Sequence, residues 1–229
     1  MFKVFLRRLI TPFRSLRVMT SREAYAQWAA HYPPRPHNLL MSVEQSALQA
    51  LIPNLAGLRV LDVACGSGRW GRWAYENGAA YVVGLDNSPQ MLARAALDDL
   101  VCAEMSMVPL PDACVDVVIC GLALGHLPGA AMRSALMEMG RVLRPGGVCL
   151  VSDFHPCLAW QGAQRTLQDD RGHTFVVEHY IHRLSDYHAA SVEAGLQLTG
   201  VREPSPPDYP ESTPLVLVLR FQKSPLRSA

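Results

Sequence analysis

The segment that most restricts the fold of this chain is a glycine-rich turn between a short apolar run and a helix. The run Arg59–Val63 is a predicted strand that enters the turn, and Arg69–Glu76 is a predicted helix that leaves it. Gly66, Gly68 and Gly71 stand at the spacing G-x-G-x-x-G. Glycine lets the backbone approach a ligand closely, and the first N–H groups of the helix are free to bind it. The sequence therefore predicts a strand–turn–helix unit that binds a nucleotide-like ligand.

Short apolar runs and helical patterns alternate along the rest of the chain. Further strands are predicted at 81–86, 100–104, 115–121 and 148–153, and further helices at 42–55 with Ser42 as N-cap, 89–98, 130–143 and 186–194. Continuous apolar strands separated by helices indicate an α/β fold with a parallel sheet covered by helices on both faces. The proline-dense segment between the last two predicted strands, 196–203 and 215–222, leaves no room for a crossover helix. We therefore expect a mainly parallel seven-stranded sheet with an antiparallel last strand.

The N-terminal segment differs from the rest in charge. Six cationic residues precede the first acid, Glu23, and apolar residues recur there at roughly helical spacing with a break at Pro12. We expect a basic arm and an aromatic lid in residues 1–41, followed by one domain in 42–229. Residues 1–20 either make peripheral contact with an anionic membrane or pack over the domain.

Composition excludes several classes of protein. Hydrophobic residues make up 49% of the 229 residues, and the formal net charge is only +1, which argues against binding nucleic acid through phosphate neutralisation. No apolar run approaches the roughly 20 residues that span a bilayer. The six cysteines form no C-x-x-C pair. We therefore expect a cytoplasmic protein with reduced cysteines and no bound metal.

Acidic residues around the glycine turn narrow the choice of ligand. Asp86 ends the second predicted strand, where an acid holds ribose hydroxyls. Asp62, inside the first strand, favours a ligand with an ammonium group and opposes a pyrophosphate. Glu104 and Met105 follow the third strand, where an oxygen can accept a hydrogen bond from an adenine amino group. Taken alone, the glycines do not separate a nicotinamide dinucleotide from another adenosine ligand.

Four motifs together resemble the class I S-adenosylmethionine-dependent methyltransferases. They are Asp62-Val63-Ala64-Cys65-Gly66-Ser67-Gly68, Gly84-Leu85-Asp86, Pro109-Leu110-Pro111-Asp112 and the Arg-Val-Leu-Arg-Pro-Gly-Gly segment at 141–147. The resemblance covers about residues 42–151 and is strongest to the small-molecule branch that includes ubiquinone/menaquinone and biotin-pathway methyltransferases. It implies a Rossmann-like, doubly wound fold with an N-terminal helical lid. It also implies S-adenosylmethionine as cofactor, with S-adenosylhomocysteine as product, and a small-molecule acceptor.

The family's cofactor residues are carried over position by position. The resemblance implies a glycine loop along the methionine part of the cofactor, Asp86 at the ribose hydroxyls, and Glu104 at the adenine. Many relatives carry Asp at the position of Glu104. The carbonyls of residues 120–122 are expected to face the methionine amino group. The full expected set is Tyr32, Asp62, Ala64, Gly66, Ser67, Gly68, Asp86, Asn87, Met91, Glu104, Met105 and Gly121.

Histidines are the candidates for proton transfer. Methyl transfer is an in-line displacement, so a hydroxyl or carbon acceptor needs a general base, whereas an amine needs none. His126 follows the fourth predicted strand and His155 follows the fifth, and each is either a base or a structural residue. The aromatic segment 25–37 resembles the lid that closes over the substrate in this family, or it anchors the arm. The expected acceptor-binding residues are Tyr25, Trp28, His37, His126 and His155.

Two other functions remain open from the sequence. A nicotinamide-dependent oxidoreductase would use the same glycines, but the chain lacks a Tyr-x-x-x-Lys pair and carries Asp62. A non-catalytic cofactor-binding protein would keep the same motifs. No Asn/Asp-Pro-Pro-Tyr/Phe element follows the fourth predicted strand, so we expect no nucleic-acid substrate. The basic arm raises the hypothesis of a lipid-like acceptor, and a secondary metabolite is the alternative. The atom that is methylated and the oligomeric state stay open.

Overall fold

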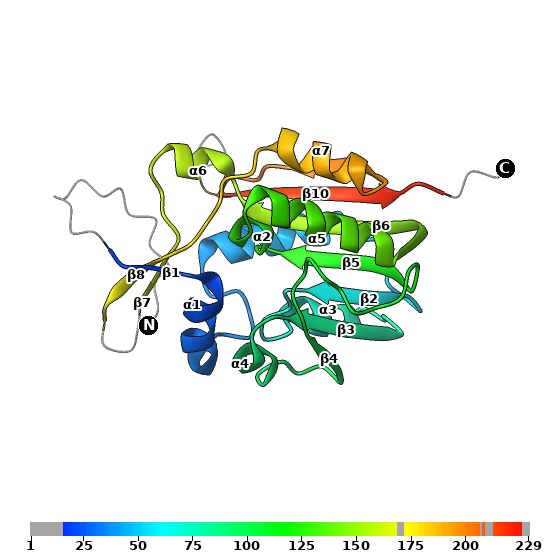
Figure 1. Cartoon of the computed structure of the whole chain (residues 1–229), viewed down its shortest axis with the longest axis horizontal. Coiled ribbons are helices and arrows are strands. Elements are labelled where there is room, and N and C mark those ends of the chain that lie inside the picture. The colour runs from blue at the N-terminus through cyan, green and yellow to red at the C-terminus, as the bar shows by residue number, and fades with distance from the viewer. Residues whose placement is uncertain (1–15, 169–171, 207, 209–212, 226–229) are drawn as a thin grey trace.

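The computed structural model of the chain describes residues 16–168, 172–206, 208 and 213–225. Its larger sheet is built from β2 Arg59–Val63, β3 Tyr81–Asp86, β4 Asp99–Cys102, β5 Val115–Gly121, β6 Leu143–Phe154, β9 Leu196–Arg202 and β10 Val216–Lys223. The strand order is β4-β3-β2-β5-β6-β10-β9 (Figure 1). Neighbours from β4 to β6 pair parallel, and β10 runs antiparallel to both β6 and β9. The predicted seven-stranded, mainly parallel sheet is confirmed.

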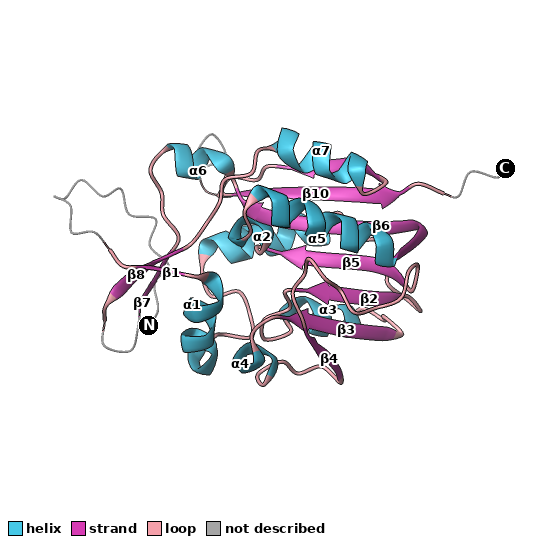
Figure 2. Cartoon of the chain, viewed as in Figure 1, coloured by secondary structure: helices cyan, strands magenta, loops and turns pink. Residues whose placement is uncertain are grey.

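Helices cover both faces of this sheet. They are α2 Leu39–Gln49, α3 Arg69–Glu76, α4 Pro89–Leu92, α5 Gly129–Val142, α6 Pro156–Trp160 and α7 Leu184–Glu193. Figure 2 shows α5 and α7 in front of the sheet and α2 and α3 behind it. Successive side chains of a strand point to opposite faces, so Leu61 packs into the core under α5 while Val60 packs into the core under α2 and α3.

The bounds of α2 and α4 differ most from the sequence-based expectation, and α2 ends at Gln49 instead of residue 55. Helix α2 begins at Leu39, because the Asn38 side-chain oxygen accepts a hydrogen bond from Met41 N at 2.9 Å, so Asn38 and not Ser42 is the N-cap. Helix α4 ends at Leu92 instead of continuing to residue 98. The chain then turns, and the side chain of Leu97 packs against Gly71 and Gly84, where no Cβ is in its way.

Leu97 explains why this part of the chain needs glycine. A Cβ added at Gly71 would lie 2.7 Å from Leu97 Cδ1, and one added at Gly84 would lie 2.8 Å from the same atom. Gly71 and Gly84 therefore permit close packing between α3, β3 and the segment after α4. Gly68 combines this contact with a left-handed φ of 78°, so it serves both the packing and the turn.

A second, three-stranded sheet was not predicted. It consists of β1 Val18–Met19, β7 Thr166–Gln168 and β8 Thr174–Val177, in the order β1-β8-β7. Such strands are too short to show an alternating pattern in the sequence. Helix α1, Ser21–Trp28, follows β1 with a capping box between Thr20 and Glu23, and continues into the 3₁₀ turn η1, Ala29–His31. We call this sheet with α1 and η1 the cap.

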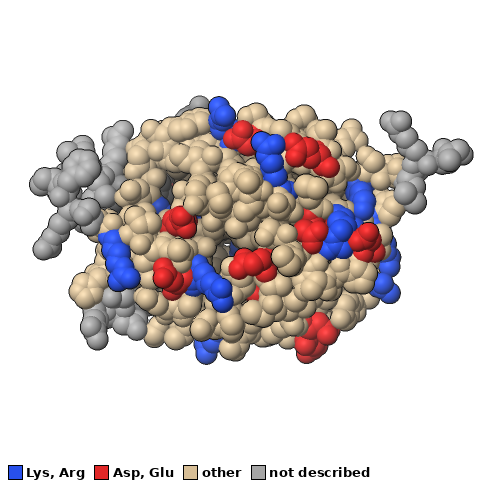
Figure 3. Space-filling view, viewed as in Figure 1, with Lys and Arg blue, Asp and Glu red and all other residues tan. Residues whose placement is uncertain are grey.

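The surface carries both signs of charge. On the face shown in Figure 3, Lys and Arg side chains lie interspersed with Asp and Glu. A mixed surface gives a phosphate backbone no continuous positive field. None of the helices in the described ranges is long and apolar enough to cross a membrane. Most of the basic arm, residues 1–15, lies outside the described residues.

Candidate active site

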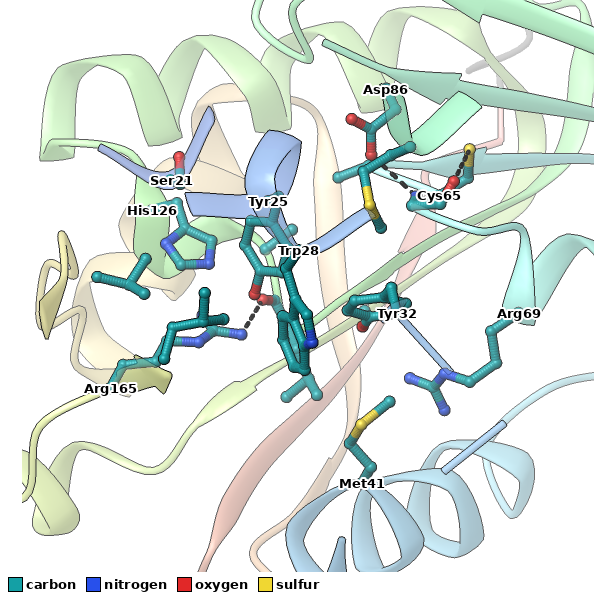
Figure 4. A pocket seen from close by; sticks show the side chains of 18 of the residues that line it. Ser21, Tyr25, Trp28, Tyr32, Met41, Cys65, Arg69, Asp86, His126 and Arg165 are labelled. Atoms are coloured by element: carbon teal, nitrogen blue, oxygen red, sulfur yellow. Dashed lines mark hydrogen bonds between the residues drawn. The ribbon is translucent and has the colours of Figure 1, made fainter. Parts of the chain in front are cut away.

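A cavity lies between the carboxyl ends of β2, β3 and β5 and the cap. Its lining runs from Asp86 and Gly66 at one end to His126 and Arg165 at the other (Figure 4). Ligands of open α/β sheets bind at the carboxyl ends of the strands, so this is the expected place for a cofactor.

The glycine turn shapes one wall of the cavity through its backbone. Ala64 and Gly66 have left-handed φ values of 54° and 56°. Gly66 N donates to Asp86 Oδ2 at 2.9 Å, and a Cβ added at Gly66 would lie 3.1 Å from the side chain of Met91. The turn is thus tied to the end of β3, and its backbone faces the cavity directly.

Asp86 and its neighbours form the end of the cavity beside the turn. The second Asp86 oxygen accepts a hydrogen bond from Ser88 N at 2.9 Å, and burial raises the pKa of the carboxyl. Asn87 Nδ2 donates to both carboxylate oxygens of Glu104, at 3.1 and 3.2 Å. The structure brings nine of the twelve expected cofactor residues to the cavity lining. Ser67, Gly68 and Glu104 are outside that lining.

Asp62 is a buried acid in β2, the strand that leads into the glycine turn. Its Oδ2 accepts a hydrogen bond from Gly71 N at 2.7 Å. Burial raises the pKa of this carboxyl to about 7, although the Gly71 bond and the positive charge of Arg69 act in the opposite direction. Asp62 therefore takes up a proton much more readily than an ordinary aspartate.

A buried ion pair beside Asp62 was missed by the sequence analysis. Glu44 of α2 lies 2.8 Å from Arg69 Nη2, and it also accepts hydrogen bonds from Ser152 Oγ at 2.7 Å and from Trp70 Nε1 at 3.3 Å. A Cβ at Gly121 would lie 2.6 Å from Trp70 Nε1, which explains the glycine at the end of β5. The sequence did carry one sign of this pair, since a charged residue, Arg69, stands directly after the glycine turn.

Aromatic rings of the cap form the opposite wall. Tyr25 meets the ring of His126 edge-on, with centroids 5.5 Å apart. Trp28 meets Tyr32 at 4.8 Å and His37 at 5.5 Å, both edge-on. Edge-to-face packing at these distances is favourable, so the rings hold one another in place. The structure thus brings together four of the five expected acceptor-binding residues.

His126 points one unpartnered nitrogen into the buried part of this wall. Its Nδ1 lies 2.9 Å from the carbonyl oxygen of Glu178, so Nδ1 carries the proton and Nε2 carries a lone pair. Nε2 is buried and has no hydrogen-bond partner. Burial, with a smaller contribution from Arg165, lowers the pKa of His126 to about 3. His126 is therefore neutral near pH 7 and only a weak base.

Arg165 reaches the same wall from the segment before β7. Its Nη2 donates to the carbonyl oxygen of Leu122 at 2.9 Å, and its guanidinium lies 4.4 Å above the ring of Phe154. Leu122 has a left-handed φ of 58° at the end of β5. Arg165 Nη1 is buried without a hydrogen-bond partner. No sequence pattern marks Arg165, because it lies in an irregular segment.

His155 lies outside this cavity. It is the N-cap of α6, where Nδ1 accepts a hydrogen bond from Cys157 N at 3.2 Å and Nε2 lies 3.0 Å from Glu203 Oε1. It lines a smaller neighbouring cavity with Asp153 and Tyr187. Across the residues that the structure describes, no group of three or more His, Cys, Asp or Glu side chains is arranged to hold a metal ion.

Comparison with known proteins identifies the family. Residues 61–151 match the family described as "Methyltransferase domain". An uncharacterized methyltransferase of Synechocystis is 31% identical over 149 residues, which cover 59% of this chain and 70% of that protein. The chain belongs to the class I S-adenosylmethionine-dependent methyltransferases. A solved methyltransferase of this kind from Mesorhizobium loti has a TM-score of 0.67 at 26% identity and covers 81% of this chain and 100% of its own.

Membership of this methyltransferase family does not fix the acceptor. A malonyl-[acyl-carrier protein] O-methyltransferase of Enterobacter lignolyticus is 39% identical over 148 residues, which are 60% of this chain and 57% of that enzyme. A second protein of that name, from Pectobacterium atrosepticum, is covered over 51% of its length. The chain thus spans little more than half the length of these relatives.

The residues at the glycine turn fit the cofactor of the methyltransferase family. The left-handed backbone at Ala64 and Gly66 opens the wall where a Cβ at Gly66 would press on Met91. Asp86 stands at the rim of the same space with two backbone N–H groups holding its oxygens, which leaves further lone pairs for hydroxyl donors. The Asp86 oxygens can accept hydrogen bonds from the ribose hydroxyls of the cofactor, and the bare backbone of the turn leaves space for its methionine part.

Proposed function

We propose that this protein transfers a methyl group from S-adenosylmethionine to a small-molecule acceptor. The observation that carries the proposal is the single cavity that joins the glycine turn and Asp86 to the aromatic wall of the cap. One end has the acid and the bare backbone that an adenosine ligand needs, and the other has room and side chains for a second molecule.

We assign a role to each group at the cofactor end. Asp86 binds the two ribose hydroxyls, and Asn87 and Met105 flank the adenine. Ala64 and Gly66 approach the methionine part. Arg69 lines the cavity while its Nη2 is paired with Glu44, so its remaining face is available to the cofactor carboxylate.

Methyl transfer then depends on how the chain positions the acceptor next to the methyl group. When bound, S-adenosylmethionine supplies an electrophilic methyl group on a sulfonium centre. The chain aligns the acceptor and excludes water, for which the ring packing of Tyr25, Trp28 and Tyr32 is suited. Because the pKa of His126 is lowered to about 3, we assign it to positioning of the acceptor through Nε2 rather than to proton removal. An acceptor that is already nucleophilic at neutral pH fits this arrangement.

We extend the proposal to the N-terminal region. Residues 1–41 act as an arm and lid over a methyltransferase domain in 42–229, since the described part of this region supplies Tyr25, Trp28 and His37 to the cavity. The relatives named for malonyl-[acyl-carrier protein] support a metabolite-like acceptor, but the rings of the cap decide which acceptor enters.

Calorimetric titration tests the cofactor. We expect S-adenosylmethionine and S-adenosylhomocysteine to bind at micromolar concentration and NADH not to bind. Binding of NADH alone would replace the proposal with an oxidoreductase. Transfer of a labelled methyl group to any acceptor in a metabolite panel then separates an enzyme from a non-catalytic cofactor-binding protein of the same fold.

A further inference from the structure

Two of the buried polar atoms in the cavity lining that have no hydrogen-bond partner lie on the same wall. They are Arg165 Nη1, a donor, and His126 Nε2, an acceptor. Figure 4 shows both side chains beside Tyr25, at the end of the pocket away from Asp86. Buried polar groups in proteins are nearly always hydrogen-bonded, so two orphans on one cavity wall indicate the place of a ligand.

The buried charged residues of the lining already have partners. Arg69 is paired with Glu44, Asp62 accepts from Gly71 N, and Asp86 accepts from two backbone N–H groups. Among the described residues, no carboxylate lies within ion-pair distance of Arg165. Arg165 is therefore a positive charge in the lining that has no ion-pair contact with a described carboxylate.

The nearby acid Asp153 is occupied elsewhere. Its oxygens accept hydrogen bonds from Phe154 N at 2.7 Å and from Tyr187 Oη at 2.8 Å, and His179 Nε2 lies 3.5 Å away. These contacts, together with the charges of His179 and Arg165, lower the pKa of Asp153 to about 2 despite its burial. Asp153 is thus ionised, and it lines the neighbouring cavity in contact with His179.

The guanidinium of Arg165 is held in place before any ligand arrives. Nη2 is fixed on the Leu122 carbonyl, and the guanidinium lies against the ring of Phe154. Nη1 cannot turn away without loss of both contacts. A planar guanidinium fixed in this way selects a flat anionic group, and carboxylate is the best match in shape and charge.

His126 adds a second requirement. Its Nε2 offers a lone pair, because Nδ1–H is used by the Glu178 carbonyl. A carboxylate oxygen placed there would be repelled. The ligand must therefore present an O–H or N–H to His126 as well as an anion to Arg165.

We propose that Arg165 Nη1 and His126 Nε2 form the acceptor-recognition site, and that the acceptor is a small organic acid. Its carboxylate binds Arg165, and a hydroxyl or N–H of the same molecule binds His126. The proposal rests on the methyltransferase function proposed above, and it adds the chemical class of the acceptor.

Matched probes test the anion. Protein saturated with S-adenosylhomocysteine is titrated with salicylate, benzoate, anthranilate and hexanoate, each against its neutral amide. We expect the acids to bind more tightly than the amides, and Arg165→Met to weaken acid binding by about 10- to 100-fold, the size of a hydrogen bond to a charged group. Arg133→Met is the matched control, because Arg133 is an exposed arginine on α5. Equal binding of acids and amides, or no binding of any acid, overturns the proposal.

A chemical double-mutant cycle tests the second contact. Salicylate differs from benzoate only by its hydroxyl, so the gain from that hydroxyl should vanish in His126→Phe and persist in Arg133→Met. A gain that survives in His126→Phe overturns the assignment of Nε2.

Stability of the acceptor-free protein gives an independent readout. Arg165→Met should raise the midpoint of thermal unfolding of the protein saturated with S-adenosylhomocysteine, because it removes a half-buried charge that has no ion-pair partner among the described residues. A lowered midpoint, together with unchanged acid binding, would show a purely structural arginine. Titration with S-adenosylhomocysteine alone reports on the proposed function separately, so the two proposals fail by different measurements.

Discussion

The two ends of the cavity are stabilised by different forces. The glycine-turn end is held by backbone hydrogen bonds to Asp62 and Asp86 and by the buried pair of Glu44 and Arg69. The cap end is held by edge-to-face rings, and His126 Nε2 and Arg165 Nη1 there have no hydrogen-bond partner. A network of hydrogen-bonded charged groups suits a ligand that is always the same, whereas ring packing beside unpartnered groups suits a wall that the ligand itself completes.

The largest expected effect lies in the buried ion pair. Glu44→Gln leaves the positive charge of Arg69 buried and unpaired, which should lower the free energy of unfolding by about 3–5 kcal/mol. Chemical denaturation measures it. The double variant Glu44→Leu/Arg69→Leu should recover much of the loss, because it removes both charges. A loss in Glu44→Gln no larger than that of the ring variant below would contradict the contrast between the two ends.

The next effect concerns the cofactor. Asp86→Ala removes the acceptor for Gly66 N and Ser88 N and the proposed contact with the ribose, so the affinity for S-adenosylhomocysteine should fall by about 10- to 100-fold. Calorimetry measures it, with Asp98→Ala as the control because Asp98 is an exposed acid outside the cavity lining. Equal affinities of the two variants would remove Asp86 from the site.

The dependence of stability on pH also separates the two ends of the cavity, because burial lowers the pKa of His126 at one end and raises the pKa of Asp62 at the other. Burial lowers the pKa of His126 from 6.5 to about 3, so the unfolded chain binds a proton there that the folded chain does not. Stability from this group is full above about pH 6.5 and is lost as pH falls toward 3, by about 1.4 kcal/mol per pH unit.

Asp62 changes the stability with pH in the opposite direction from His126. Its folded pKa is raised from 3.8 to about 7, so between these values the folded chain holds a proton that the unfolded chain has lost, and stability falls as pH rises. Between about pH 4 and 6.5 the two slopes cancel in the wild type. His126→Phe should therefore become less stable as pH rises through this window, and Asp62→Asn more stable. Denaturation midpoints across pH measure both, and slopes of the same sign would refute the assignment.

The smallest effect is expected in the rings of the cap. Tyr25→Leu removes the ring contacts with His126, Trp28 and Tyr32 and should cost about 2 kcal/mol of unfolding free energy, because each such pair contributes about 0.5–1.5 kcal/mol and leucine keeps part of the apolar contact. Tyr25→Phe keeps the ring and should stay close to the wild type in thermal unfolding. A large loss in Tyr25→Phe would instead show that the hydroxyl stabilises the cap.

Local patterns made much of the glycine-turn end predictable. The strand–turn–helix unit and Asp86 follow from residues close together in sequence, where apolar periodicity and glycine act through the local backbone. Helix α4 was predicted too long because its end depends on Leu97 packing against Gly71 and Gly84, a contact that no local pattern records.

By itself the sequence determined the mainly parallel seven-stranded sheet, the glycine turn, the acids Asp62 and Asp86, and the family. Only the tertiary structure decided that Glu44 pairs with Arg69, that Arg165 and His126 meet at one wall, and that His155 lies in the neighbouring cavity. The reason is physical. Backbone conformation and the type of each element follow from neighbouring residues and repeated spacing, whereas the order of the strands and the partners of a buried charge are decided by packing between segments far apart in the chain.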